Sequence, residues 1–290
     1  MYKLVTIDLD GTLLDSYGNV SEENKQAIKR VINQGCEVVL CSGRMPDSME
    51  NFAREIGADK YLISGNGSQI YDIQNKEILY SNYIEKQKIL DIIQICEENS
   101  MYYCIYTEST IITKSLNYNV LYYSNENKTK NLEKKSNINL VENIYDYIKN
   151  MDKDIFLKMT VCDEDKVIFD NLIKVLRKIK GIDVLDVEHM SRKMITYGTE
   201  KFELAYYYTE ITNANVNKWT AIENIIQKLD IKPEEVMAIG DNINDKEMII
   251  NAGIGIAVGN SAPYVKEMAN DVVADNNSNG VAEALNKYIP

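Results

Sequence analysis

The chain has 290 residues, of which 45% are hydrophobic, and its formal net charge is −12, with an isoelectric point near 4.8. This length and apolar content predict one or two domains with a sizeable core. The negative charge argues against a nucleic acid or an anionic membrane as partner, because phosphate groups repel such a surface. No apolar run is long enough to span a bilayer, the N-terminus does not resemble a secretory signal, and the five sparse cysteines favour reduced thiols. We therefore expect a cytoplasmic protein.

Short apolar runs alternate with amphipathic segments in both flanks of the chain. In the N-terminal flank the predicted elements are a strand at 3–7, a helix at 21–34, a strand at 36–41, a helix from 46 and a strand at 61–63. In the C-terminal flank they are a helix at 217–229, a strand at 236–239, a helix at 244–252, a strand at 254–258 and a helix at 280–288. Alternating strands and helices predict parallel strands with helices on both faces of the sheet.

The middle of the chain has a different pattern. Its helices are longer and its strands, such as 102–107 and 202–209, are rich in Tyr and Thr. A polar segment at 124–139 is predicted to be an exposed loop whose lysines are solvated. We therefore predict an α/β fold in which residues 1–83 and 214–290 form a doubly wound parallel-sheet core, and residues 84–213 form an inserted α+β domain.

Two carboxylates follow the first predicted strand, in the sequence Asp8-Leu9-Asp10-Gly11-Thr12. Ligands of an open parallel sheet bind at the carboxyl ends of its strands, so both carboxylates can face one crevice. Two carboxylates this close repel each other unless a cation or a proton separates them, and Mg²⁺ prefers such oxygen ligands. An ordinary Asx-type turn is the structural alternative.

Further polar residues lie at other strand ends and helix starts. Ser42 and Gly43 follow the second strand, where a hydroxyl and a backbone N–H can hold a phosphoryl oxygen, although a Ser-Gly pair is often only a turn. The charge of Lys218 opposes the dipole of the helix that it begins, so its ammonium either gains a partner or lies in solvent.

The last of these strand ends carries the sequence Gly240-Asp241-Asn242-Ile243-Asn244-Asp245. Asp241 again lies at the carboxyl end of a strand. Asn244 and Asp245 lie near the next helix start, where acidic side chains are favoured, so helix capping and a functional role are both open for them.

Taken together, these segments resemble the haloacid dehalogenase superfamily of phosphotransferases. Asn66-Gly67, after the third strand, and the stretch at 255–260 match the same superfamily. The order of the motifs, with a long insert between Gly67 and Lys218, is similar to the Cof-type branch. That resemblance implies a Rossmann-like core, and it implies that the insert is a large α/β cap that determines substrate specificity.

The resemblance also implies roles for individual residues. Asp8 is implied as the nucleophile that becomes an aspartyl phosphate, and Asp10 as the general acid and base. The implied Mg²⁺ ligands are Asp8, Asp241 and the backbone carbonyl of Asp10. Phosphate binding is implied for Ser42, Gly43, Lys218 and Asn244, and an indirect or water-mediated metal contact for Asp245. The single histidine, His189, has no role in this scheme.

Four more residues are candidate substrate contacts, namely Arg44, Asn66, Arg192 and Lys193. The last two lie near the end of the insert, where they could meet an anionic group of the substrate.

The sequence therefore predicts a Mg²⁺-dependent phosphatase acting on a small phosphorylated metabolite, such as a sugar phosphate. A phosphomutase of the same superfamily is the nearest alternative, and it would return the phosphoryl group to its product. A phospho-accepting signalling domain is a more distant alternative, because it has no need for so large an insert.

Overall fold

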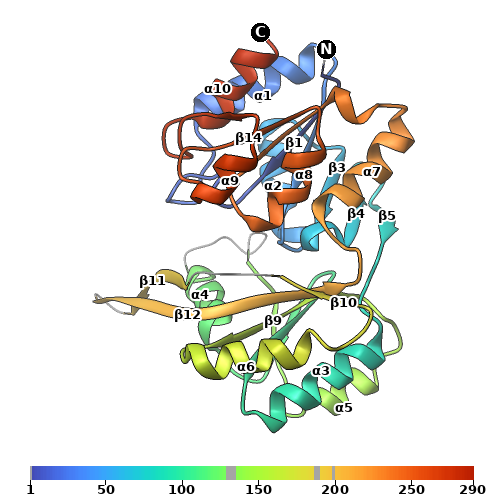
Figure 1. The fold of residues 1–290 in the computed structure, drawn as a ribbon, viewed down its shortest axis with the longest axis vertical. Coiled ribbons are helices and arrows are strands. Elements are labelled where there is room, and N and C mark those ends of the chain that lie inside the picture. Colours follow the sequence, from blue (N-terminus) through green and yellow to red (C-terminus); the bar gives the residue numbers. More distant parts are fainter. Residues whose placement is uncertain (1, 129–134, 186–189, 198–199) are drawn as a thin grey trace. The chain divides into compact units, whose positions relative to one another are not determined.

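The computed structural model describes residues 2–128, 135–185, 190–197 and 200–290. The chain forms two compact units, one made of Met1–Ser81 with Val216–Pro290 and the other of Asn82–Asn215 (Figure 1). These boundaries lie two residues outside those predicted from the sequence at each end of the insert. Within the described ranges, no helix combines the length and the apolar composition needed to cross a bilayer.

The first unit is built on one eight-stranded sheet in the order β15-β14-β13-β1-β2-β3-β4-β5. The strands are β1 (Leu4–Asp8), β2 (Glu37–Cys41), β3 (Tyr61–Ser64), β4 (Gln69–Asp72), β5 (Glu77–Ser81), β13 (Val236–Gly240), β14 (Ile254–Ala257) and β15 (Asp271–Val272). All neighbours from β15 to β3 pair in parallel, whereas β4 and β5 add an antiparallel edge. β1 is therefore central and lies between β13 and β2.

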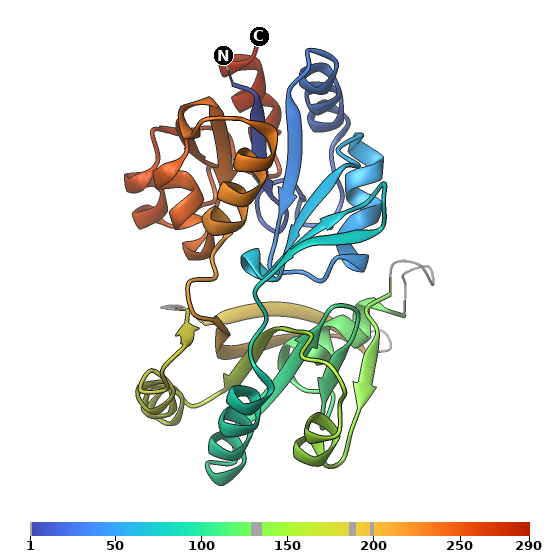
Figure 2. The same ribbon diagram turned by 90° about the vertical axis from the view of Figure 1, so that its right-hand side faces the viewer.

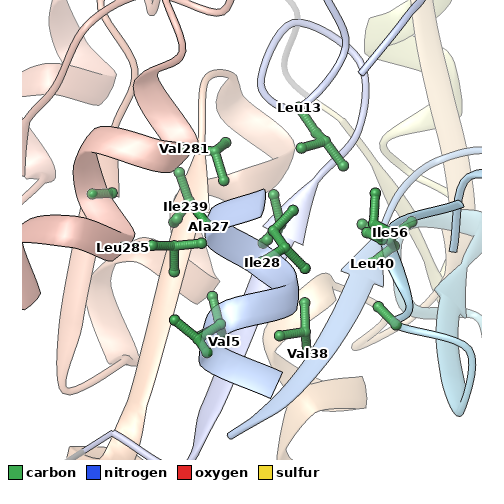
Figure 3. Packing of buried hydrophobic residues seen from close by; sticks show 14 of the residues in the cluster. Val5, Leu13, Ala27, Ile28, Val38, Leu40, Ile56, Ile239, Val281 and Leu285 are labelled. Carbon is green, nitrogen blue, oxygen red and sulfur yellow. The ribbon is translucent and has the colours of Figure 1, made fainter. Parts of the chain in front are cut away.

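Helices cover both faces of this sheet, and the alternation of side chains along β1 shows it. Val5 and Ile7 face one apolar cluster with residues of α1, α2 and α10, whereas Leu4 faces another with residues of α7 and α8. Figure 3 shows the first cluster, in which Ile28 and Leu285 pack against the strands. The helices are α1 (Glu22–Asn33), α2 (Asp47–Ile56), α7 (Lys218–Leu229), α8 (Lys246–Asn251), α9 (Pro263–Met268) and α10 (Gly280–Tyr288), with 3₁₀ turns η1 (Gly65–Gly67), η3 (Pro233–Glu235) and η4 (Ile243–Asp245). The doubly wound α/β core is confirmed.

Local capping explains where two of these helices begin. The Ser21 hydroxyl accepts a hydrogen bond from the backbone N–H of Asn24 and caps α1. The Asn217 side chain accepts from the backbone N–H of Thr220, and the Thr220 hydroxyl accepts from the backbone N–H of Asn217, so α7 begins with a capping box. Lys218 is therefore the first helical residue, and the cap fixes its backbone.

The second unit is a mostly antiparallel sheet in the order β10-β12-β9-β6-β7-β8, with β11 paired to β12. Its strands are β6 (Tyr102–Thr107), β7 (Ile111–Thr113), β8 (Ile138–Leu140), β9 (Phe156–Asp163), β10 (Ile182–Val184), β11 (Ser191–Tyr197) and β12 (Glu200–Asn213). Its helices are α3 (Lys86–Glu98), α4 (Tyr118–Glu126), α5 (Ile144–Lys149) and α6 (Lys166–Leu176). In Figure 2, α3, α5 and α6 lie along one face of this sheet, and their apolar residues form a core with Met159 and Val161 of β9.

The prediction of one exposed loop over 124–139 is wrong at both ends of that segment. Residues 124–126 are the last residues of α4, and residues 138–139 belong to β8, which pairs in parallel with β7. Polar composition concealed these elements because an edge strand and a helix end need few apolar residues. Residues 129–134, and His189, lie outside the described residues.

Candidate active site

The polar residues singled out in the first unit gather at the carboxyl edge of its sheet. Asp8 ends β1, Ser42 follows β2, and Asp241 follows β13. β1 pairs in parallel with both neighbours, and Asp8 is the register partner of Cys41. The three strand ends therefore meet at one edge, where a doubly wound sheet binds its ligands.

Lys218 lies at the centre of this group. Its ammonium is fully buried and lies 2.5 Å from Asp8 Oδ1 and 2.5 Å from Asp245 Oδ1. The sequence left open whether this lysine gains a partner or lies in solvent, and the structure gives it two carboxylates. These ion pairs outweigh the unfavourable position at the start of a helix.

Asp8 and Asp241 form a candidate cation site in addition to the contact with the Lys218 ammonium. Asp8 Oδ2 is buried and has no hydrogen-bond partner among the residues that the structure describes. Carboxylate oxygens of Asp8, Asp241 and Asp245 lie within 4.8 Å of one another. Three carboxylates face one ammonium, so the group lacks positive charge, and a buried oxygen without a donor suits a hard metal ion. The residues fit a divalent cation.

The titration behaviour of these groups has the same physical origin. Burial, followed by the Asp245 carboxylate, raises the pKa of Asp8 well above its usual value. The same two causes raise the pKa of Asp241 to about 7. Burial opposes the charged form of Lys218, but the carboxylates of Asp245 and Asp8 outweigh it and raise the pKa of this lysine. An added cation would therefore favour the ionised form of this acidic cluster.

Asp245 supports its neighbours by using both of its carboxylate oxygens. Oδ1 accepts from Lys218, and Oδ2 accepts from the backbone N–H groups of Asp241 and Asn242 at 2.9 and 3.0 Å. This carboxylate is fully buried and fixes the loop after β13. Because its acceptors are occupied, Asp245 is better placed to orient the site than to bind a metal ion directly.

Two further loops border the same strand ends. The Ser42 hydroxyl accepts from the backbone N–H of Arg44 at 3.2 Å, in the turn that contains Gly43. Asn244 donates from Nδ2 to Asn66 Oδ1 at 3.1 Å, which links η4 to η1. Asn66 has a φ of 60°, in the left-handed region that asparagine tolerates.

Asp10 differs from Asp8 in its surroundings. Its side chain is 55% exposed and pairs with Arg44 at 2.6 Å. It is not one of the three carboxylates of the acidic cluster. Any metal contact by Asp10 is therefore expected from its backbone, as the sequence resemblance implies.

Arg192 and Lys193 belong to β11 of the second unit, whereas the strand-end cluster belongs to the first unit. Arg192 forms an ion pair with Glu203 across the β11–β12 pair. The Lys193 ammonium lies 4.6 Å from the centre of the Tyr122 ring. Their role as substrate contacts stays a prediction.

Sequence reasoning missed the roles of Asn260 and Asn276, and it named Thr12 without its partner. Asn260 donates from Nδ2 to the Gly11 carbonyl at 2.7 Å, and Asn276 donates from Nδ2 to the Leu14 carbonyl at 2.8 Å, so both hold the loop after β1. The Thr12 hydroxyl donates to Asp241 Oδ1 at 3.0 Å. The match of residues 255–260 to the superfamily is the signal that could have identified Asn260.

Comparison with known proteins defines the class. The family model for haloacid dehalogenase-like hydrolases matches residues 5–285, and the chain belongs to this family, in its Cof-type branch. It is therefore an enzyme of a hydrolase family.

Particular relatives cover almost the whole chain. Phosphatase YwpJ of Bacillus subtilis is 27% identical over 98% of both chains. The 5-amino-6-(5-phospho-D-ribitylamino)uracil phosphatase YcsE of the same species is 28% identical over 99% of this chain and 96% of its own. The solved structure of a haloacid dehalogenase-like hydrolase from B. subtilis superposes with a TM-score of 0.80 at 25% identity, covering 99% of each chain. The two curated relatives are phosphatases, which places this enzyme among phosphoric monoester hydrolases.

Proposed function

We propose that this enzyme hydrolyses small phosphate monoesters through an aspartyl phosphate on Asp8, with Mg²⁺ as cofactor. The observation that carries the proposal is the state of the Asp8 carboxylate. Oδ1 pairs with Lys218, and Oδ2 is buried with no hydrogen-bond partner in the described part of the chain. Asp241 belongs to the same carboxylate cluster. A carboxylate needs no base to activate it as a nucleophile, and neighbouring cations lower its repulsion from an anionic phosphate.

The reaction has two steps. In the first, an Asp8 oxygen bonds to phosphorus while the bond from phosphorus to the leaving oxygen breaks, and that oxygen takes the proton of the Asp10 carboxyl group. In the second, the Asp10 carboxylate takes a proton from water, the water oxygen bonds to phosphorus, and the bond to Asp8 breaks. Both side chains return to their starting forms. Proton transfer of this kind typically contributes about 10²–10⁴-fold.

The other residues at the strand ends are proposed to bind the metal ion or the phosphate. Asp8 and Asp241 would hold Mg²⁺ with the backbone carbonyl of Asp10, and the ion would supply charge compensation for the phosphate. Lys218, which Asp245 orients, supplies a second positive charge. The groups proposed to hold the phosphoryl oxygens are Ser42, Gly43, Lys218 and Asn244.

The substrate class follows from the relatives and stays broad. The name of YcsE specifies a small phosphorylated metabolite. We infer a small phosphorylated metabolite here as well, with the inserted unit 82–215 selecting it.

The first prediction tests the nucleophile. Asp8→Asn should lower the turnover of p-nitrophenyl phosphate at least about a thousandfold, because the amide cannot attack phosphorus. EDTA should stop the wild-type reaction and added Mg²⁺ should restore it. Beryllium fluoride, which mimics a phosphoryl group on a carboxylate, should inhibit the wild-type enzyme.

Asp47→Asn is the matched control, since Asp47 is an exposed carboxylate at the start of α2 and should tolerate the change. Retained turnover in Asp8→Asn would overturn the nucleophile assignment. Release of free phosphate from a hydrolysed sugar phosphate separates a phosphatase from a phosphomutase.

A further inference from the structure

Arg44 binds Asp10, the second carboxylate of the motif, at the strand ends. Arg44 donates from Nε to Asp10 Oδ2 at 2.7 Å and from Nη2 to Asp10 Oδ1 at 2.6 Å. The guanidinium fork therefore holds both oxygens of one carboxylate. A bidentate pair of this kind fixes the orientation of the carboxylate as well as its position.

Arg44 is itself held in place from three directions. Its backbone N–H donates to the Ser42 hydroxyl at 3.2 Å, and its carbonyl accepts from the N–H of Gly65 at 3.0 Å. Its guanidinium lies 5.5 Å from the centre of the Phe52 ring on α2. The side chain is only 20% exposed. The fork is therefore set by the turn after β2 and by α2, independently of Asp10.

Asp10 lies in a more open environment than Asp8. Its side chain is 55% exposed, whereas Asp8 is almost fully buried against Lys218. The two carboxylates of the motif are thus served by separate cations, Lys218 for Asp8 and Arg44 for Asp10. A bidentate ion pair restricts the rotamers of an exposed carboxylate.

We propose that Arg44 is a positioning residue for Asp10, and that it keeps this carboxylate in the orientation needed to exchange a proton with the leaving oxygen and with water. The proposal rests on the proposed function and replaces a direct substrate contact for Arg44. Each Asp10 oxygen accepts one N–H from the fork. Misplacing a catalytic group by about 1 Å can cost about 10²-fold.

The test compares two substrates of the same shape whose leaving groups differ in their need for a proton. p-Nitrophenolate leaves readily without one, whereas phenolate leaves more slowly and gains from general acid catalysis. The parameter is kcat/KM, which covers the steps up to departure of the leaving group. Arg44→Ala should lower kcat/KM for phenyl phosphate about tenfold or more, and for p-nitrophenyl phosphate less than about threefold.

Three variants sharpen the result. Arg54→Ala is the control, because Arg54 also donates from Nε and Nη2 to a carboxylate, in this case to the single oxygen Oε1 of Glu50 on α2. It should leave the activity on both substrates unchanged. Arg44→Lys should recover part of the phenyl phosphate activity. In an Asp10→Ala background, Arg44→Ala should have no further effect on the ratio between the two substrates, since the positioned group is gone.

Equal losses on both substrates in Arg44→Ala would show a merely structural role and overturn the proposal. A raised KM with unchanged kcat would show a direct substrate contact and would also overturn it. The proposed function fails by a different result, which is wild-type inactivity with Mg²⁺ or full activity of Asp8→Asn. The two failures are therefore distinguishable.

Discussion

At the scale of single residues, the buried ammonium of Lys218 is the contact on which the acidic cluster depends. Lys218→Met keeps most of the side-chain volume but leaves the Asp8 and Asp245 carboxylates without their cation. Removing one partner of a buried ion pair typically costs about 3–5 kcal/mol. We expect a loss of this size in the free energy of unfolding without Mg²⁺, measured by urea denaturation, together with a fall in turnover of about 10²–10³-fold.

Lys228 gives the matched control, because it is an exposed lysine on the same helix. Lys228→Met should change stability by less than about 0.5 kcal/mol, as surface substitutions usually do. If the two variants were equally stable, the Lys218 ion pairs would not contribute to folding. The free energy of unfolding can also be measured at increasing Mg²⁺ concentrations. If it rises more steeply for Lys218→Met than for the wild type, the ion replaces the lost positive charge.

The residues of the cluster could be predicted better than their partners. The types and spacing of Asp8, Lys218 and Asp241 indicated one site, because a parallel sheet brings its strand ends together. The pairing of Asp10 with Arg44 could not be foreseen, since it depends on rotamers and on the turn after β2. The same holds for Asn260, whose contact with Gly11 joins residues 249 positions apart.

At the scale of elements, the position of α7 depends on a glycine in η1. Gly67 has a φ of 106°, and a Cβ there would lie 2.1 Å from the carbonyl oxygen of Asn217. Gly67→Ala would therefore strain its own backbone and push away the residue that caps α7. Because Lys218 follows that cap, we expect lower turnover along with lower stability. The left-handed backbone alone costs about 1–2 kcal/mol, and the clash should add about 1–3 kcal/mol.

Gly35→Ala separates these two effects. Gly35 has a similar φ of 89°, but apart from its own residue and its two chain neighbours no atom of the described residues lies within 4 Å of a Cβ built there. This variant should lose only the backbone contribution, and its turnover should equal that of the wild type. Thermal or urea unfolding of both variants gives the difference between their losses in the free energy of unfolding. Equal losses would mean that the backbone around Asn217 moves away from the added Cβ without a loss of stability.

Among the elements, helix starts and central strands were predictable, and edge elements were not. The helix at 280–288 and the strand at 102–107 match the sequence prediction residue for residue. β4 and β5 were not predicted, because an antiparallel hairpin at a sheet edge lacks the continuous apolar run of a buried strand. β12 extends from Glu200 to Asn213, beyond the predicted segment at both ends, because β11 pairs with its first residues and β9 and β10 pair with its last.

At the scale of the whole molecule, the inserted unit has its own apolar core and its two ends are joined. Asn213 donates from Nδ2 to Asn82 Oδ1 at 2.6 Å, and Asn82 donates from Nδ2 to the carbonyl of Ala214 at 3.4 Å. A domain whose ends lie together can be inserted or excised with little change to its fold. We therefore expect residues 82–215, expressed alone, to fold and to unfold in one cooperative transition.

Urea denaturation followed by far-UV circular dichroism tests this expectation. The slope of the free energy with urea should lie near about 1–3 kcal/mol/M, as for other small domains. Asn82→Ala in the fragment should lower its stability, because the amide of Asn213 then loses its acceptor and the ends are free to separate. A fragment without a cooperative transition would show that the apolar core of α3, α5 and α6 on its sheet is insufficient, and that the unit depends on the first unit for its fold.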